Sequence, residues 1–164
     1  MTPKSFSNFV GQSRVKTRLE MAIAAAKSRG EVLGHVLLIG SPGSGKATLA
    51  QIIADAMGVN ITNTSGPAIE KAGEVAGLLT SLEKGDVLFI DDIHQLKRVI
   101  GEYFYPAMKD FSLAIIIDQG PQARSLRLQL AKFTLIGTAP RQESVPRELV
   151  SCFPIIENMS ALHE

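Results

Sequence analysis

Short, unbroken apolar runs alternate along this chain with longer stretches in which apolar residues recur at three- and four-residue steps. Unbroken runs are typical of strands buried on both faces of a parallel sheet, and the periodic stretches predict helices. In chain order we expect a helix at 14–29, a strand at 35–39, a helix at 46–57, a strand at 59–62, a helix at 69–82, a strand at 86–90, a helix at 96–108 that Pro106 breaks, a strand at 133–137, a short helix at 146–150 and a last apolar run at 153–156. This alternation predicts parallel crossovers and a doubly wound α/β sheet.

The alternation is interrupted between residues 113 and 130. The runs 113–117 and 125–130 are β-type and flank a turn at 118–121, so they predict a β-hairpin inserted into the α/β order. Its apolar residues are Ile115, Ile116, Ile117, Leu126 and Leu128. Because apolar strands are usually buried, most of these are expected in the sheet core. The alternative is that they present an apolar surface to a partner protein. Residues 1–12 are expected to form an N-terminal arm.

A glycine-rich turn joins the first predicted strand to the helix that follows it. It reads Gly40-Ser41-Pro42-Gly43-Ser44-Gly45-Lys46-Ala47-Thr48. Such a turn brings backbone N–H groups and a helix N-terminus to one point, which suits phosphate. Lys46 adds a positive charge for the terminal phosphates. The nucleotide-binding pattern ends in a Ser or Thr whose hydroxyl holds Mg²⁺, but here Ala47 follows the lysine.

The apolar strand at 86–90 ends in an acidic pair, Asp91-Asp92. The carboxyl ends of parallel strands meet at one edge of the sheet, so this pair is expected beside the glycine-rich turn. Taken alone, that turn could equally be a helix-capping turn. Together with the acidic pair it predicts a site for phosphate and a metal ion.

Composition narrows the class of protein. A chain of 164 residues suits one domain with a substantial core. Its 17 basic and 16 acidic residues nearly balance, so net charge gives no argument for direct nucleic-acid binding. Cys152 is the only cysteine, which excludes an internal disulfide, and we expect it to be buried. No signal peptide or apolar run of membrane length is visible, so a cytoplasmic protein is predicted.

From about Phe9 to Phe153 the chain resembles the RuvB family of AAA+ motors, which drive branch migration of Holliday junctions. The resemblance rests on the segments 24–27, 35–38, 64–67, 70–73, 86–91, 105–108 and 133–137. It implies an AAA+ large ATPase domain, hexameric assembly on duplex DNA and ATP-driven translocation with RuvA as partner, in DNA recombination and repair. In the family a helical lid and a DNA-contacting winged-helix domain follow. Neither is found in residues 1–164, which we take as a single AAA+ large domain, so direct DNA contact is not expected.

The resemblance also implies which residues bind the cofactor, ATP or ADP. The implied nucleotide-binding residues are Gly40, Gly43, Ser44, Gly45, Lys46, Ala47 and Thr48 in the phosphate loop, together with Phe9, Val10 and Asp110. Asp91 matches the metal-side carboxylate, and Asp92 stands for the catalytic glutamate with one methylene fewer. His94 matches a family histidine and is interpreted as structural, since no cluster of Cys or His accompanies it. The 113–130 hairpin is implied to dock a RuvA-like partner.

The chain departs from the family pattern at its hydrolytic parts. Ala47 lacks the Mg²⁺-binding hydroxyl, residues 138–141 read Thr-Ala-Pro-Arg in place of Ala-Thr-Thr-Arg, and residues 149–154 read Leu-Val-Ser-Cys-Phe-Pro in place of Leu-Arg-x-Arg-Phe-Gly. The family's arginines there serve a neighbouring subunit's nucleotide, and such an arginine is worth about 10³–10⁵ in rate. We therefore predict binding of ATP or ADP, with hydrolysis weak or lost. If Mg²⁺ binds, it does so without its usual Ser or Thr hydroxyl ligand. The alternatives are an inactive relative that holds nucleotide as a protein-interaction module, and a fold whose pocket is empty.

Overall fold

The main sheet contains five strands that all run in the same direction. The computed structural model describes residues 13–116, 121 and 124–159. The strands are β1 (Val36–Ile39), β2 (Ile61–Ser65), β3 (Val87–Asp91), β6 (Thr134–Ala139) and β7 (Ile155–Asn158), in the spatial order β2-β3-β6-β1-β7. Every neighbouring pair is parallel. The carboxyl ends of all five strands therefore lie along one edge of the sheet, where ligands of open α/β folds bind.

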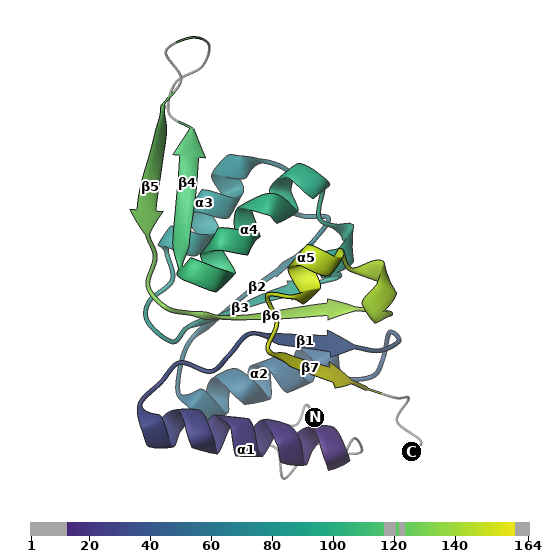
Figure 1. Cartoon of the computed structure of the whole chain (residues 1–164). Helices are drawn as coiled ribbons and strands as arrows, with labels where there is room; N and C mark the ends of the chain where they lie inside the picture. Colours follow the sequence, from purple (N-terminus) through teal and green to yellow (C-terminus); the bar gives the residue numbers. More distant parts are fainter. Residues whose placement is uncertain (1–12, 117–120, 122–123, 160–164) are drawn as a thin grey trace.

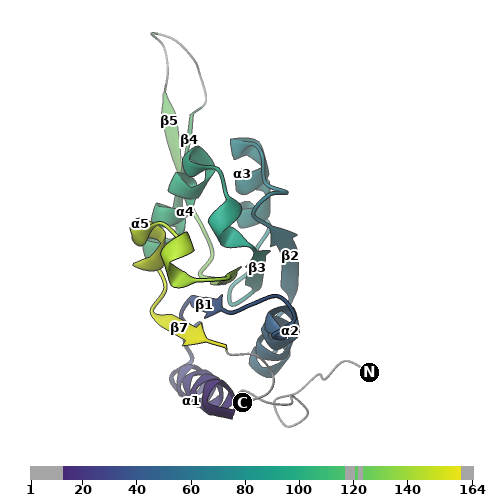
Figure 2. The ribbon, with the colours of Figure 1, turned by 90° about the vertical axis from the view of Figure 1, so that its right-hand side faces the viewer.

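Helices cover both faces of this sheet (Figures 1 and 2). One face carries α1 (Ser13–Arg29) and α2 (Lys46–Met57), and the other carries α3 (Ala72–Thr80), α4 (Arg98–Asp110) and α5 (Arg147–Val150). Two short 3₁₀ turns, η2 (Ile93–Gln95) and η4 (Gln142–Ser144), follow β3 and β6. This arrangement confirms the predicted doubly wound α/β fold.

The apolar runs are unbroken because each central strand fills a core on either side. In β1, Val36 and Leu38 belong to the core under α1 and α2, whereas Leu37 and Ile39 belong to the core under α3 and α4. All four are buried. Successive side chains of a strand point to opposite faces, so a strand covered on both faces needs apolar residues at every position.

The predicted hairpin is present as a small sheet of its own. Strands β4 (Ser112–Ile116) and β5 (Ser125–Gln129) pair antiparallel and extend away from the main sheet in both views (Figures 1 and 2). Leu113 is buried, but Leu128 opposite it is only half-buried and Leu126 is 48% exposed. The expectation of burial is therefore wrong for Leu126 and Leu128, because the hairpin leaves the main sheet and has helix α4 beside only part of it. The side chains of Ile115–Ile117 lie outside the described residues.

Pro106 does not break the fourth helix as predicted. Helix α4 runs from Arg98 through Pro106 to Asp110. A proline inside a helix removes one N–H bond, here to the carbonyl of Glu102, whose residue is exposed and can be hydrated instead. Phe104, Ala107 and Met108, on both sides of the proline, are buried in the core and hold the helix together. Among the helices that the structure describes, none is long and apolar enough to span a bilayer.

Helix α3 is shorter than the predicted 69–82. It begins at Ala72, after Lys71 as N-cap residue, and ends at Thr80. The Glu74 carboxylate accepts hydrogen bonds from the backbone N–H groups of Glu70 and Lys71, at 3.2 and 3.0 Å, which is the reciprocal half of a capping box. Ile69 is buried within the preceding turn, so its apolar character reflects core packing and not a helical position.

Candidate functional site

The phosphate loop leaves the carboxyl end of β1 and enters α2. Gly43 and Gly45 have φ angles of 85° and 86°, in the left-handed region that glycine adopts without strain. Gly40 sits where the chain is crowded, since a Cβ atom on it would lie 2.6 Å from the carbonyl oxygen of Met159. Ser44 is buried and donates its hydroxyl to the Ser41 carbonyl oxygen at 2.8 Å, which closes the loop upon itself. The result is a rigid turn at the N-terminus of α2, suited to an anion.

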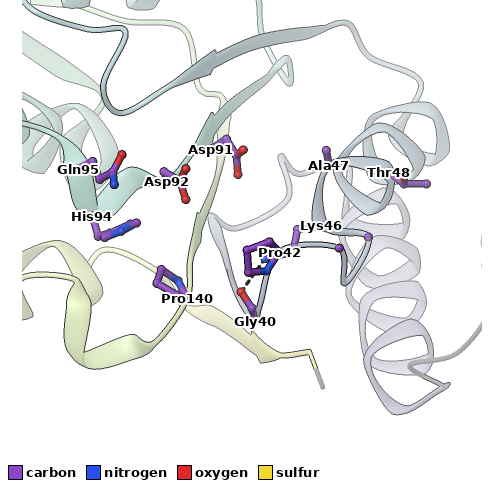
Figure 3. Close-up of a pocket in the computed structure, with 12 residues that line it drawn as sticks. Gly40, Pro42, Lys46, Ala47, Thr48, Asp91, Asp92, His94, Gln95 and Pro140 are labelled. Carbon is purple, nitrogen blue, oxygen red and sulfur yellow. Dashed lines mark hydrogen bonds between the residues drawn. The ribbon is translucent and has the colours of Figure 1, made fainter. Parts of the chain in front are cut away.

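Lys46 is folded over this loop. Its ammonium donates to the carbonyl oxygens of Gly40 at 2.6 Å and Ser41 at 2.9 Å, and it lies 3.3 Å from Ser44 Oγ. Burial lowers the pKa of Lys46, while the carboxylates of Asp91 and Asp92 act in the opposite direction. Figure 3 shows the contact to Gly40 as a dashed line. The charge is thus held at the mouth of the loop, between backbone carbonyls and the acidic strand end.

The acidic wall of the site is the end of β3. Asp91 is the last residue of the strand, and Asp92 turns the chain with a left-handed backbone, at φ 51° and ψ 53°. This turn is pressed against the start of the loop after β2, since a Cβ atom on Gly66 would lie 2.2 Å from the Asp92 carbonyl oxygen. The backbone N–H of Gly66 also donates to the Asp91 carbonyl oxygen at 2.8 Å. Neighbouring backbone therefore fixes the position of both acidic residues.

Thr138, on the adjacent strand β6, holds both acidic residues through one hydroxyl. It donates to Asp91 Oδ1 at 2.5 Å and accepts from the backbone N–H of Asp92 at 2.8 Å. Thr138 is fully buried. Its hydroxyl therefore serves the acidic turn from behind, while Pro140 reaches the pocket itself.

A pocket of about 450 Å³ separates the phosphate loop from the acidic wall (Figure 3). Its lining residues are Gly40, Pro42, Gly43, Gly45, Lys46, Ala47, Thr48, Asp91, Asp92, His94, Gln95 and Pro140. The structure thus brings the predicted phosphate-loop and acidic residues to one cavity, with Ser44 buried behind the loop. In Figure 3 the Thr48 side chain points away from Asp91.

Of the predicted nucleotide-binding residues that the structure describes, Asp110 is not brought to this pocket. Phe9 and Val10 lie outside the described residues. Asp110 is an exposed residue at the end of α4, next to Phe111, whose ring packs against His35 at 5.8 Å between centroids. His35 precedes β1, whereas the phosphate loop follows it, and a four-residue strand spans about 13 Å. Asp110 therefore lies toward the opposite edge of the sheet, because α4 ends at the amino ends of the strands.

Sequence reasoning gave no pocket role to His94 and Gln95. Both belong to η2, the 3₁₀ turn directly after Asp92, and both line the pocket. The left-handed turn at Asp92 directs this segment along the cavity wall. The polar residues two and three positions after Asp92 were the available signal, but the backbone turn that directs them is not visible in the sequence.

The protein groups at this pocket fit Mg²⁺ only in part. Mg²⁺ at nucleotide sites takes one or two carboxylates together with phosphate oxygens and water. Asp91 offers a carboxylate with one oxygen already bonded to Thr138, and Ala47 offers no oxygen. Within the described part of the chain, no group of three or more His, Cys, Asp or Glu residues could hold a metal ion. Any metal here would depend on the Asp91 and Asp92 carboxylates, which both line the pocket, and on the nucleotide's own oxygens.

The segment 149–154 contains no charged residue and contributes side chains to the core. Leu149, Cys152 and Phe153 are all buried in the core beside α4, as expected for Cys152. The Cys152 thiol lies 3.4 Å from the Glu148 carbonyl oxygen, and burial raises its pKa. Arg141 and Arg147, the nearest arginines in sequence, are exposed.

The chain is similar to RuvB proteins over almost its whole length. Residues 1–159 match the model of the P-loop domain of the Holliday junction DNA helicase RuvB. The RuvB Holliday junction branch migration motor of Thermotoga maritima is 46% identical, with a TM-score of 0.84, over 96% of this chain and 48% of that chain. A variant of the same RuvB is 46% identical, with a TM-score of 0.88, over 97% of this chain and 49% of that chain.

This chain thus spans about half the length of the solved RuvB chains that it matches. The match confirms the resemblance that the sequence segments indicated, and it agrees with the AAA+ type of α/β fold. The chain belongs to the RuvB family and corresponds to the P-loop domain of that family.

Proposed function

We propose that this domain binds ATP or ADP in the pocket between the phosphate loop and Asp91, and that it hydrolyses ATP slowly or not at all. The observation that carries the proposal is the loop itself. Its left-handed glycines, its buried Ser44 and the Lys46 ammonium over the Gly40 carbonyl form a site that suits a phosphate. Burial lowers the pKa of Lys46, and a bound phosphate would add an anionic partner that stabilises its charge.

Slow or absent hydrolysis is supported by what surrounds that site. Ala47 brings no metal ligand, and Asp92 is one methylene shorter than a glutamate. A displacement of about 1 Å in a positioned group can cost roughly 10²-fold in rate. Pro140 brings no hydroxyl to the cavity, and the hydroxyl of Thr138 is bonded to Asp91 and Asp92 instead. Penalties of this kind do not add, but all act on hydrolysis and none on the glycines or the lysine of the phosphate loop.

In the context of the family, the domain is proposed as the nucleotide-binding part of a branch-migration assembly in DNA recombination and repair, in the cytoplasm. The Thermotoga protein is described as a Holliday junction branch migration motor, and this chain matches about half of it. A hexamer and a RuvA-like partner at the 113–130 hairpin follow from that context. We propose residues 1–164 as one AAA+ large domain, without direct DNA contact by this part.

A second candidate function is an inactive relative that acts as a nucleotide-holding interaction module. The exposed hairpin supports its interaction role, which the first candidate shares, because Leu126 is a large apolar residue that is 48% exposed on a sheet separate from the main one. Exposed apolar side chains of this kind are suited to protein contacts. The two candidates share the nucleotide site, and measurable hydrolysis is compatible only with the first.

The test is calorimetric titration of the purified chain with ADP and with a non-hydrolysable ATP analogue, each with Mg²⁺ and with EDTA. We expect binding that Mg²⁺ changes little and that Lys46→Ala abolishes. Strong dependence on Mg²⁺ would show that another group replaces the missing hydroxyl and would favour an active motor. Absence of binding at millimolar nucleotide would overturn the proposed function. Measurable ATP turnover by the same sample would exclude the second candidate.

A further inference from the structure

We infer that His94 is a binding residue for the terminal phosphate of a nucleoside triphosphate and makes the pocket favour ATP over ADP. The inference rests on the proposed nucleotide site and adds to it a specificity determinant. His94 is the second residue of η2 and lines the pocket next to Asp92. In Figure 3 its ring lies between Asp92 and Pro140 and points toward the cavity.

The ring has one nitrogen available for a ligand. Nδ1 is enclosed by protein and has no hydrogen-bond partner among the described residues. No described residue forms a hydrogen bond with Nε2 either. Unlike Nδ1, Nε2 is not among the buried side-chain atoms that lack a partner. His35 is held in the fold by hydrogen bonds at both ring nitrogens. The His94 ring has no such bond to a described residue, so hydrogen bonding within the fold does not explain its place. Nε2 is therefore the ring atom left to donate to a ligand, and His94 lines this pocket.

The position fits the third phosphate and not the second. The phosphate loop holds the phosphates nearer the sugar, and the terminal one extends from Lys46 toward the acidic wall. That wall is where His94 stands. Of the residues lining the pocket, those with side-chain hydrogen-bond donors are Lys46, Thr48, His94 and Gln95. Lys46 belongs to the loop side, and Thr48 points away from Asp91.

A donor at this place has a specific electrostatic task. A terminal phosphate here approaches the Asp91 and Asp92 carboxylates, and Ala47 supplies no ligand for a metal between them. Pro140 contributes no hydroxyl on the opposite side of the ring. A hydrogen bond to a charged oxygen is worth more than one between neutral groups, so a single donor can decide whether the triphosphate is accepted.

The test compares ADP with a non-hydrolysable ATP analogue by calorimetry in EDTA, for the wild type and for His94→Ala, His94→Gln and His94→Asn. EDTA removes any contribution from a metal. We expect His94→Ala to weaken binding of the triphosphate by about tenfold and to leave ADP binding unchanged. A glutamine amide reaches to where Nε2 is, whereas an asparagine amide mimics Nδ1. The glutamine variant is therefore expected to bind the triphosphate nearly as tightly as the wild type, and the asparagine variant as weakly as the alanine variant.

Gln142→Ala is the control, since Gln142 is an exposed polar residue of the other 3₁₀ turn, η4, and does not line the pocket. It should leave both affinities unchanged. Unchanged triphosphate binding in His94→Ala, or an equal loss of ADP and triphosphate, would overturn the inference, and the latter would mark a purely structural histidine. Failure of the wild type to bind either nucleotide would instead overturn the proposed function, on which this inference rests.

Discussion

Thr138 donates its hydroxyl to the Asp91 carboxylate across neighbouring strands, at 2.5 Å, and the same oxygen accepts the Asp92 N–H at 2.8 Å. The strand register makes this possible, because Ile90 of β3 pairs with Gly137 of β6 and the next residues on each strand therefore lie together. One buried hydroxyl thus fixes the side chain of the first acidic residue and the backbone of the second. Asp92 needs that support, since its left-handed backbone is unfavourable for a residue other than glycine.

Replacing Thr138 by valine should loosen the acidic turn. Valine keeps the shape of threonine, but it leaves the Asp92 N–H without its acceptor. We expect the free energy of unfolding to fall by about 1–3 kcal/mol, and the backbone N–H of Asp92 to exchange with deuterium faster. Denaturant unfolding and amide hydrogen exchange measure the two effects.

Thr134→Val is the control for this variant, because Thr134 is a buried hydroxyl on the same strand that donates to the Leu33 carbonyl oxygen at 2.6 Å. It should lower the free energy of unfolding by a similar amount. Exchange of the Asp92 N–H should then rise no more than this loss of stability explains. Equal exchange at Asp92 in both variants would contradict a specific role for Thr138.

Two glycines are expected to respond to alanine in opposite ways. Gly77 is an exposed position inside α3 with nothing within 4 Å of an added Cβ, so Gly77→Ala should stabilise the protein by about 1 kcal/mol through helix propensity. At Gly66 an added Cβ would lie 2.2 Å from the Asp92 carbonyl oxygen. Gly66→Ala should destabilise by about 1–3 kcal/mol. Unfolding in urea measures both, and a stable Gly66→Ala protein would show that the acidic turn can move.

Acid should destabilise the fold through His35. The ring is buried, donates from Nε2 to the Met108 carbonyl oxygen at 2.9 Å and accepts the Leu135 N–H at Nδ1 at 2.9 Å. Burial lowers the pKa of His35, so the folded protein keeps the ring neutral while the unfolded chain takes up a proton below about pH 6.5. Stability should therefore fall as the pH drops below that value, down to the lower pKa of the folded state.

The matched variant is His35→Gln, which retains a donor and an acceptor and does not titrate. Its stability at pH 8 is expected to be lower than that of the wild type, and the difference should narrow toward pH 5. The free energy of unfolding measured across this range tests it. Parallel pH profiles for the two proteins would show that other groups cause the acid sensitivity.

The sequence predicted the sheet well because parallel strands buried on both faces leave a local signature. Every residue of β1 fills one of two cores, so the strand reads as an unbroken apolar run. Pro106 was misjudged because its local effect was given more weight than the burial of Phe104 and Met108 on either side. Leu126 was expected to be buried because strand apolarity alone does not tell whether a hairpin joins the main sheet.

The candidate site was predictable where function is carried by consecutive residues, as in the phosphate loop and the acidic pair. It was not predictable where position depends on strand register or on a backbone turn. The Thr138 hydroxyl reaches Asp91 only through the pairing of β3 with β6, and His94 enters the pocket wall only after the left-handed turn at Asp92. Asp110 is adjacent in sequence to the core residues of α4, but that helix ends at the opposite edge of the sheet from the phosphate loop.

Restoring a hydroxyl at residue 47 should restore sensitivity to Mg²⁺. Ala47 is exposed in the first turn of α2 and lines the pocket that Asp91 also lines, so threonine can be accommodated at a helix-propensity cost of less than about 1 kcal/mol. We expect Mg²⁺ to tighten ADP binding by about tenfold more in Ala47→Thr than in the wild type, as measured by calorimetry with Mg²⁺ and with EDTA. Ala47→Val has nearly the same shape without the oxygen and should behave as the wild type does. If the valine variant gains the same sensitivity, the added bulk and not a metal ligand is responsible. If neither gains it while both bind ADP, Asp91 alone cannot complete the site because Thr138 already bonds one of its oxygens.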